Sequence, residues 1–343
     1  MGSSSLRWVE LARDDKCGLV LERCVVEPLQ AGWIVAGHIE QFDEVAAALR
    51  RLFKASGSTA RDVALAMPDS AVITTKIVLP SDLGEAELLH HVESEVDRLS
   101  DRPLADMSID YTVKGRAQAS EQPGEVEVLI TAASQEKVQD RLGLAESAGL
   151  TPVVVDVETP AAMLAVRQLI SVRLRALMDP VALIQVGTEG ASLHVTHQGE
   201  IVHAAHLHLG GARLTELIAQ AYGLDESDAE AQKCSESLPD DYSQTVLQPF
   251  IKKLADGLVS DLDVFLSTSG QKIDTVYLSG GSSVLSGLQD EINRRTFSDC
   301  VLTDPFSGML VGKAVNKSAF QYSARAGMLT ACGLALRRFH GSC

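Results

Sequence analysis

Aromatic side chains are scarce in this chain: Phe, Trp and Tyr make up 4% of the 343 residues, whereas apolar residues as a group make up 45%. A chain of this length is long enough for two or three domains. Its cores must therefore be built mainly from Val, Leu, Ile and Ala. This composition is typical of α/β proteins, whose sheets are buried on both faces.

Basic residues are also few, because 30 Lys and Arg stand against 46 Asp and Glu and leave a formal net charge of −16. A nucleic-acid groove needs a basic stripe, and docking on an anionic lipid surface needs basic clusters. Arg337 and Arg338 are too few for stable anchoring. We therefore expect no nucleic-acid partner, and contact with a membrane only through a partner protein.

Signals for secretion, membrane crossing and metal binding are missing as well. No charged-plus-apolar signal opens the chain, and no apolar run approaches the ~20 residues that a transmembrane helix needs. The 6 cysteines lack C-x-x-C or metal-ligand spacing, which favours reduced thiols in a cytosolic protein. His206 and His208 share one face of a predicted strand while His203 points the other way, so we expect a solvated strand face there rather than a ligand cluster.

Hydrophobic spacing predicts an α/β protein with two similar halves, because strand-strand-strand-helix recurs in both. Strands are expected at 6–11, 19–26, 63–67, 71–79, 107–113, 125–132, 151–157, 276–279 and 301–303, with three more between 181 and 209. Helices are expected at 42–55, 135–148, 213–222, 226–234, 245–269, 284–295 and 324–338. Another helix, within a small α+β module of about 80–150, should bury one face formed by Leu89, Val92, Val96 and Leu99.

Short glycine turns follow or precede several of these elements. Gly187 follows a buried strand, Gly210 and Gly211 precede a helix, and Gly280 and Gly281 follow another strand. A glycine after a strand lets backbone N–H groups approach a phosphate, and the start of a following helix favours an anion. One such turn is weak evidence, but several in this order predict a nucleotide cleft between two α/β halves.

The order of these motifs resembles the actin-like ATPase superfamily. In particular, the chain is similar to the type IV pilus assembly protein PilM family, in the FtsA-like branch of that superfamily. The resemblance covers almost the whole chain and rests on seven segments: CVVEPL at 24–29, SAVITTK at 70–76, VVVDVE at 153–158, LPDDY at 238–242, VLQPF at 246–250, DPF at 304–306 and ACGLALR at 331–337.

The resemblance implies an actin-like ATPase fold of class α/β, with two α/β halves around a nucleotide cleft and an FtsA-type 1C (α+β) subdomain insertion. Subdomain 1A would comprise 1–79, 152–180 and 320–343, and subdomain 1C would comprise 80–151. Subdomain 2A would comprise 181–212 and 272–319, and subdomain 2B would comprise 213–271.

The same resemblance implies a cytoplasmic ATP-binding scaffold of the inner-membrane platform that builds the pilus for twitching motility. Such a scaffold binds the N-terminal cytoplasmic tail of PilN in a groove between 1A and 1C, formed here by residues near 70–80 and by strands around 107–113 and 125–132. Further partners would be the PilN/PilO platform and the pilus motor apparatus. The protein would lie at the inner membrane through its partner, and homo-oligomers stay open.

The nucleotide-binding motifs of the family carry over onto five groups of residues. These are the first phosphate loop (Gly2, Ser3, Ser4, Ser5, Arg7), the second phosphate loop (Gly187, Thr188, Glu189), the turn into 2B (Gly210, Gly211, Arg213), a ribose- and adenine-side pair (Glu230, Lys233) and an adenosine-side turn (Gly280, Gly281, Ser282). Two alternatives stay open: 2–5 is an ordinary terminal segment, and Glu230 with Lys233 is a surface ion pair.

Two positions depart from the family pattern where a Mg²⁺ ion would be organised. Met1 directly precedes Gly2, so the family's preceding strand and Asp are missing; either the recorded start is too late or half of the first loop is absent. Gln185 stands where the family usually has Asp, and an amide is a poorer partner for hydrated Mg²⁺. Mg²⁺ is therefore an optional cofactor beside ATP, with no metal ligand assigned.

Glu158 falls where actin-like proteins place the residue that positions the attacking water, although it also reads as an ordinary polar helix start. Phosphoryl transfer depends on metal and positioned groups. We therefore expect a nucleotide-binding scaffold with weak or no ATPase activity. Two alternatives are a working ATPase or small-molecule kinase of the same fold, and the cytoplasmic domain of a type II secretion platform protein. The latter continues into a transmembrane helix, whereas this chain ends soon after its last predicted helix.

Overall fold

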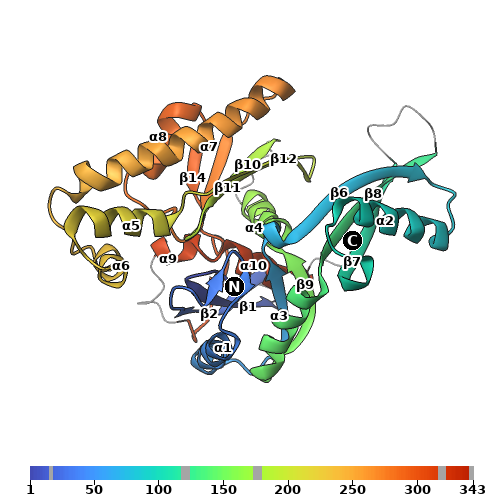
Figure 1. The fold of residues 1–343 in the computed structure, drawn as a ribbon, viewed down its shortest axis with the longest axis horizontal. Coiled ribbons are helices and arrows are strands. Elements are labelled where there is room, and N and C mark those ends of the chain that lie inside the picture. The colour runs from blue at the N-terminus through green and yellow to red at the C-terminus, as the bar shows by residue number, and fades with distance from the viewer. Residues whose placement is uncertain (15–17, 117–123, 173–179, 316–321, 340–343) are drawn as a thin grey trace. The chain divides into compact units, whose positions relative to one another are not determined.

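The computed structural model describes residues 1–14, 18–116, 124–172, 180–315 and 322–339 (Figure 1). The chain divides into two compact units, which are described separately. One unit comprises residues 29–158 together with Met1, and the other comprises residues 2–28 and 159–343.

A five-stranded sheet forms the centre of the unit of residues 2–28 and 159–343. Its strand order is β12-β11-β10-β13-β14, with β10, β11 and β12 antiparallel and β10, β13 and β14 parallel. The predicted three successive strands between 181 and 209 are confirmed. The strands are β10 (Val181–Val186), β11 (Ala191–His197), β12 (Glu200–Leu207), β13 (Thr275–Ser279) and β14 (Asp299–Leu302).

Alternation along the two central strands divides the side chains between two cores. Ile184 and Leu278 face one apolar cluster, whereas Leu183 and Tyr277 face the other. The near-continuous apolar sequence of β10 follows from this burial on both faces. The first cluster lies under α7 (Gln248–Ser269) and α8 (Leu288–Thr296), and the second lies against α4 (Glu158–Val172) and α10 (Leu329–Leu336).

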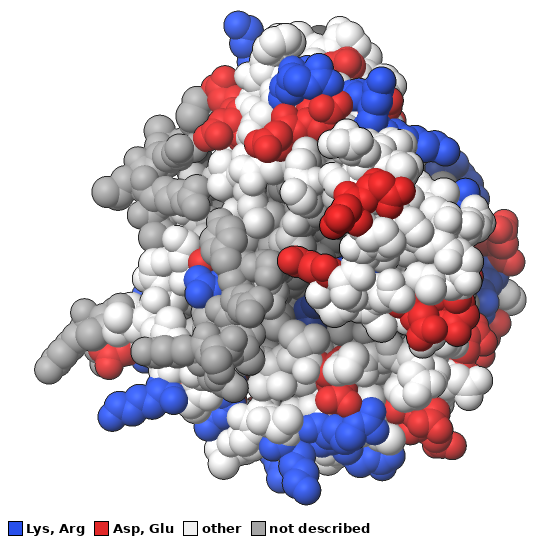
Figure 2. All heavy atoms as spheres, turned by 90° about the vertical axis from the view of Figure 1, so that its left-hand side faces the viewer, with Lys and Arg blue, Asp and Glu red and all other residues white. Residues whose placement is uncertain are grey.

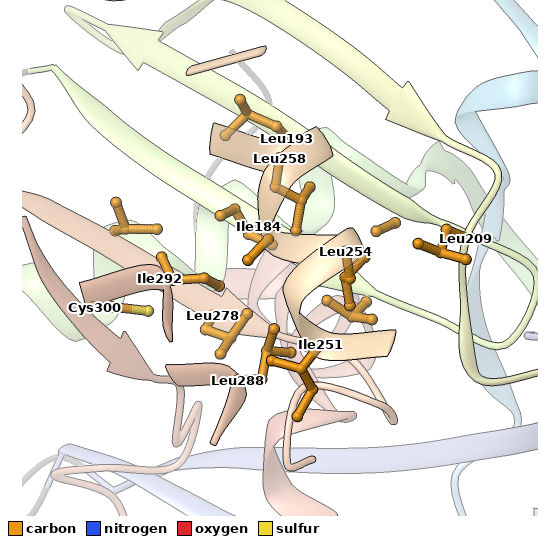
Figure 3. Close-up of a cluster of buried hydrophobic side chains, with 14 of the residues drawn as sticks. Ile184, Leu193, Leu209, Ile251, Leu254, Leu258, Leu278, Leu288, Ile292 and Cys300 are labelled. Carbon is orange, nitrogen blue, oxygen red and sulfur yellow. The ribbon is translucent and has the colours of Figure 1, made fainter. Parts of the chain in front are cut away.

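The long helix α7 places its apolar residues at helical spacing on the sheet. Leu254 and Leu258 lie next to Ile184 in the cluster (Figure 3). Burying each such leucine contributes roughly 1.5–3 kcal/mol. A π-helical turn, Ser243–Leu247, precedes α7, so the regular helix begins at Gln248 rather than at the expected 245.

This unit contains further strands and helices. They are β1 (Ser5–Asp14), β2 (Gly18–Pro28) and β15 (Leu310–Val311), which form a three-stranded sheet, with α5 (Gly211–Tyr222), α6 (Glu226–Ser235), α9 (Tyr322–Ala326) and a 3-10 turn, Arg337–Phe339.

Two helix predictions in this unit are wrong in their extent. The helix expected over 284–295 begins only at Leu288, because Gly287 has a φ of 89° and residues 284–287 form turns. The single helix expected over 324–338 is interrupted at Gly327 and Met328. Backbone dihedrals at these positions, rather than apolar spacing, decide where the helices begin and end.

The unit of residues 29–158 contains two parts. In the first, β5 (Asp62–Met67) and β9 (Thr151–Val157) pair in parallel, beside α1 (Phe42–Ser56) and α3 (Gln135–Ser147). The predicted helix stop at Gly57 is confirmed, since this residue has a φ of 61°. The small strands β3 (Ile34–Val35) and β4 (His38–Ile39) form a hairpin.

In the second part, β6 (Val72–Pro80), β8 (Glu125–Ser134) and β7 (Met107–Arg116) form an antiparallel sheet in the order β6-β8-β7. Two 3-10 turns, Asp69–Ala71 and Leu104–Asp106, precede β6 and β7. Because β6 pairs with β8, segments 72–80 and 125–134 share one sheet. The boundary between subdomains at residue 80 stays a prediction.

Helix α2 (Glu85–Leu99) covers one face of that sheet, but not with the whole face expected from the sequence. Val92 and Val96 are buried as predicted, whereas Leu89 and Leu99 are exposed. Leu88 packs against the cluster instead, because the buried row follows the i, i+4 spacing of 88, 92 and 96.

Within the described ranges, no helix is both long and apolar enough to cross a bilayer.

Phe297 ends α8 in a conformation that favours glycine: its φ is 55° and 95% of the side chain is exposed. A residue with a Cβ in this left-handed region costs roughly 1 kcal/mol, and the exposed ring offsets none of it by burial. We expect Phe297→Gly to raise the free energy of unfolding by about 1 kcal/mol in urea titrations.

The control for this change is Phe297→Ala, which removes the ring but keeps the Cβ atom. It should leave the free energy of unfolding within about 0.5 kcal/mol of the parent chain. An equal gain from both substitutions would show that the exposed ring, and not the backbone conformation, is the source of the destabilisation.

Candidate functional site

The turn after β10 is the predicted second phosphate loop. The chain reverses through residues 187–190 into β11, and the Gly187 N–H donates to the Gly190 carbonyl at 2.8 Å. Thr188 is half-buried and the Glu189 side chain is exposed. This turn leaves the backbone of residues 187 and 188 at the end of the strand, where two other turns meet it.

The turn that starts α5 is joined to this loop backbone to backbone. The Gly211 N–H donates to the Gly187 carbonyl at 2.9 Å, and the Ala212 N–H donates to the Thr188 carbonyl at 2.8 Å. A Cβ atom on Gly210 would lie 2.5 Å from the Thr188 oxygen, so only glycine fits there. Two of the first N–H groups of α5 therefore already have acceptors.

The turn after β13 is the third of these turns. The turns at 187–190, 210–212 and 280–282 are together called the turn assembly. The Ser282 N–H donates to the Val186 carbonyl at 3.0 Å, and a Cβ atom on Gly280 would lie 2.3 Å from the same oxygen. A Cβ atom on Gly211 would lie 2.5 Å from the Ser282 hydroxyl oxygen. The structure thus brings together three turns, of which the first and the last are about 100 residues apart in the sequence.

The predicted first phosphate loop faces the second. The Thr188 hydroxyl donates to the Ser4 hydroxyl at 2.8 Å, and the Gly2 N–H donates to the Ser5 carbonyl at 3.0 Å. Ser3 lies in the bend before β1, and Ser5 is buried as its first residue. A hydrogen bond at the surface therefore joins residues 2–5 to the second loop.

Arg7 extends from β1 toward glycines of other segments. One of its guanidinium nitrogens lies 3.3 Å from where a Cβ atom on Gly281 would be, and another lies 3.3 Å from the same position on Gly327. Gly327 is not among the residues predicted from the sequence. A glycine within the apolar segment predicted as one helix was the available signal.

The pair Glu230 and Lys233 is more than a surface ion pair. Lys233 is only 16% exposed, and its ammonium group donates to Glu230 at 2.5 Å, to the Thr215 hydroxyl at 2.7 Å and to the Gly211 carbonyl at 3.2 Å. Three acceptors use all three ammonium protons. Lys233 therefore ties α6 to the first turn of α5, through Thr215, which sequence analysis did not single out.

The charge of Glu230 is stabilised by this arrangement. Burial acts to raise the pKa of the carboxyl group, but hydrogen bonds from Lys233 and Thr215 outweigh it and hold the pKa below its usual value. Arg213, in contrast, is 46% exposed and pairs with Glu216 at 2.5 Å on the surface of α5. Only one of the two predicted basic residues of this region is thus built into the turn assembly.

The position expected to organise Mg²⁺ carries an amide instead of a carboxylate. Gln185 is half-buried on β10, and its register partners are Ser192 on β11 and Ser279 on β13. Mg²⁺ is usually held by carboxylates, which this position lacks. Among the described residues, no group of three or more His, Cys, Asp and Glu is arranged to hold a metal ion. Glu158 belongs to the other unit.

The histidines of β11 and β12 lie on opposite faces, as the alternation predicts. His206 packs edge-on against His194 with ring centroids 5.6 Å apart, whereas His203 lies 5.8 Å from the ring of Phe265 on α7. Aromatic packing therefore accounts for the placement of His203 and His206.

Two open hollows among the described residues are lined by residues outside these turns. One, of about 410 Å³, is lined by His90, His91 and neighbouring residues of α2, and the other, of about 520 Å³, lies at Glu216 and Asp225. Neither includes a predicted nucleotide residue. The turn assembly is the stronger candidate, because phosphates are bound by backbone groups and cations at glycine turns.

Figure 2 displays one face of the molecule, on which acidic and basic side chains of the described residues both occur.

Comparison with known proteins identifies the fold. A family model described as "Type IV pilus assembly protein PilM" matches residues 1–339. The structure of a "PilM-PilN type IV pilus biogenesis complex" is 24% identical, with a TM-score of 0.80 over 98% of this chain and 96% of that chain.

Two other structures are more distant. EutJ from Carboxydothermus hydrogenoformans is 15% identical, with a TM-score of 0.57 over 98% of this chain and 86% of that chain. MreB 5 of Spiroplasma citri, bound to AMPPNP, is 12% identical, with a TM-score of 0.50 over 99% and 94%. These likenesses confirm the predicted actin-like ATPase fold.

Lys233 and Arg213 provide a matched test of the turn assembly. Lys233→Met removes three hydrogen bonds and should lower the free energy of unfolding by about 1–3 kcal/mol, whereas Arg213→Met should change it by less than about 0.5 kcal/mol. Urea titration at neutral pH measures both. Equal losses would contradict a special role for Lys233.

Acidic pH should diminish the loss of stability that Lys233→Met causes. Glu230 has a lowered pKa in the folded chain, so its contribution to stability is present above its usual pKa of 4.5 and is lost as the pH falls through the folded value. The difference between the parent chain and Lys233→Met should therefore shrink below that pH. A difference that stays constant would contradict the charge-based explanation.

Proposed function

Because the chain belongs to the type IV pilus assembly protein PilM family, we propose that it is a pilus assembly scaffold that binds the N-terminal cytoplasmic tail of a PilN partner. The observation that carries this proposal is the family match over residues 1–339, which leaves almost none of the chain outside it. A relative of the same fold has been solved as a PilM-PilN complex, which supports the choice of partner.

The sheet of β6, β8 and β7 is the proposed tail-binding surface. Helix α2 packs on the face formed by Val128, Ile130 and their neighbours. Thr131 points to the opposite face, where its register partners are Thr74 on β6 and Asp110 on β7. Among the described residues, β6 and β7 each pair with another strand of this sheet on one side only. An extended peptide adds to such strands through main-chain hydrogen bonds.

Side chains on this opposite face suit a mixed polar and apolar peptide. Lys76 and Glu127 form an ion pair at 3.0 Å, and the half-buried Leu129 lies between the register partners Lys76 and Thr112. Apolar side chains of the tail would contact Leu129, while polar groups would contact the threonines. The groove between subdomains 1A and 1C is proposed to include this face.

We also propose that the turn assembly binds ATP. The two phosphate loops meet at Ser4 and Thr188, Arg7 supplies a cation, and the MreB relative was solved with a bound ATP analogue. Gln185 makes the site poor in carboxylates, so weak or no hydrolysis is expected, with Glu158 as the candidate for positioning water and Mg²⁺ as an optional cofactor.

The wider setting follows from the family as a proposal. The chain would act in the cytoplasm, held at the inner membrane by its PilN partner, together with PilO and the pilus motor apparatus. The division into subdomains 1A, 1C, 2A and 2B and the formation of homo-oligomers belong to the same proposal.

Tail binding is tested with a labelled peptide that copies the N-terminal cytoplasmic tail of the PilN from the same organism. Fluorescence anisotropy should show binding without nucleotide, and Thr131→Arg should weaken it at least about tenfold by blocking the centre of the open face. Ser267→Arg, on the exposed side of α7, is the control and should bind normally. A folded parent chain that fails to bind the peptide would refute the scaffold proposal.

ATP binding is tested by calorimetry with and without Mg²⁺. The parent chain should bind in both conditions, and Arg7→Gln should weaken binding about tenfold or more, because a charge-assisted contact to phosphate is lost. Arg294→Gln, on the surface of α8, is the control. If the folded parent chain binds no ATP, the nucleotide proposal is wrong, while the tail-binding proposal is unaffected.

A further inference from the structure

Three basic side chains gather around the start of α3 in the unit of residues 29–158. Arg102 lies in the segment between α2 and β7 and donates to the Ser134 hydroxyl at 3.2 Å. Lys137 lies in the first turn of α3, and Arg141 lies one turn later. Burial, followed by the positive charges of Arg102 and Arg141, lowers the pKa of Lys137, which places the three groups within electrostatic reach of one another. These three residues are called the basic cluster.

Arg141 is the buried member of the basic cluster. Its side chain is 3% exposed, and its guanidinium donates to the Gly37 carbonyl at 2.8 Å and to the Lys137 carbonyl at 3.2 Å. Its Nε atom is buried and has no hydrogen-bond partner among the described residues. Both hydrogen-bond acceptors are neutral, and burial lowers the pKa of Arg141, although the negative charges of Glu158 and Asp140 act in the opposite direction. The guanidinium lies back over the first turn of α3, beside Lys137.

The start of α3 adds further positive potential at the same place. The helix is 13 residues long and begins without a side-chain cap, and the hydroxyl of its N-cap residue, Ser134, accepts a hydrogen bond from Arg102. Its first N–H groups and the positive end of its dipole favour an anion. Glu136 offsets the cluster only in part, since it is exposed and lies 3.7 Å from Arg102.

We propose that the basic cluster is an oxyanion subsite that receives a side-chain carboxylate of the partner's cytoplasmic tail. This inference rests on the proposed function, and it adds the chemistry of one recognition contact. Arg102 and Lys137 reach the surface and would contact the carboxylate directly. Arg141 would add positive charge from its buried position, where its Nε atom has no hydrogen-bond acceptor among the described residues.

The place of the cluster in the fold favours the tail as the source of the oxyanion. Ser134 ends β8 beside Met107 at the start of β7, and Ala133 pairs with Val72 at the start of β6. The cluster therefore lies at one end of the proposed peptide surface. A chain with a net charge of −16 repels acidic peptides as a whole, so a local cation site would set the register of the tail.

The test is a double-mutant cycle between the chain and the peptide. The labelled tail peptide is used as it is and with every Asp and Glu replaced by Asn and Gln. Each version is titrated against the parent chain, Lys137→Gln, Arg102→Gln and the control Lys253→Gln, which changes an exposed lysine of α7. Arg141 is left unchanged because of its contact with Gly37. Titrations at about 50 and 300 mM NaCl separate screened from unscreened contributions.

We expect Lys137→Gln and Arg102→Gln each to weaken binding of the acidic peptide about tenfold at low salt, with a smaller loss at high salt. Neither should affect the neutral peptide, and Lys253→Gln should affect neither peptide. Equal losses for both peptides, or no loss for either, would overturn the inference and leave the tail-binding proposal intact. No binding of either peptide to the folded parent chain would overturn both.

Inorganic phosphate distinguishes a free anion from the tail carboxylate. If phosphate stabilises the parent chain but not Lys137→Gln in thermal unfolding, while the charge of the peptide has no effect on its binding, the cluster is a phosphate site and the carboxylate assignment is wrong. If phosphate competes with the acidic peptide but not with the neutral one, the assignment is supported, because both oxyanions then occupy one place.

Discussion

The meeting of three turns at the end of β10 is the constraint on which the unit of residues 2–28 and 159–343 depends. Carbonyl groups of residues 186–188 accept N–H groups from the start of α5 and from the turn after β13. At Gly210 and Gly280 the backbones approach too closely for any Cβ atom. These contacts set where α5 begins relative to the five-stranded sheet, and α7 then covers the core between them.

The same contacts link packing to ligand chemistry. The glycines that would let a phosphate approach are also those that let the turns pack on one another, and the N–H groups of Gly211, Ala212 and Ser282 donate to carbonyl groups of residues 186–188. Anion binding would therefore rely on Arg7 and the hydroxyl groups of the loops. Lys233, with all its protons engaged, holds the assembly together rather than waiting for a ligand.

The unit of residues 29–158 has a different physical character. A helix covers one face of its three-stranded sheet. Among the described residues, each of the two outer strands pairs with a strand of this sheet on one side only. Beside one end of that sheet lies positive charge that the described residues balance only in part. An extended peptide can add to a sheet edge through main-chain hydrogen bonds, and a carboxylate can pair with a cation beside it. Both features belong to the unit for which tail binding is proposed.

Local patterns determined much of what could be expected. The apolar runs of β10 and β13, the glycine stop of α1 at Gly57 and the alternation along β12 each depend on neighbouring residues, and the structure agrees with them. The glycine turns and the seven family segments likewise identified the actin-like fold and the family, because backbone dihedrals and close approach select glycine wherever such turns recur.

Only the tertiary structure decided which residues of similar sequence character differ in role. Lys233 is half-buried and Arg213 is exposed, although both lie near charged partners on helices. Leu89 is exposed although its spacing fits a buried face, and Arg141 is buried against Gly37, 104 residues away. Helical spacing predicts that a helix has an apolar face, but it does not predict which residues of that face are covered. Their burial depends on segments that approach from elsewhere in the chain. The sequence therefore determined the elements and the fold family, and the packing determined the contacts.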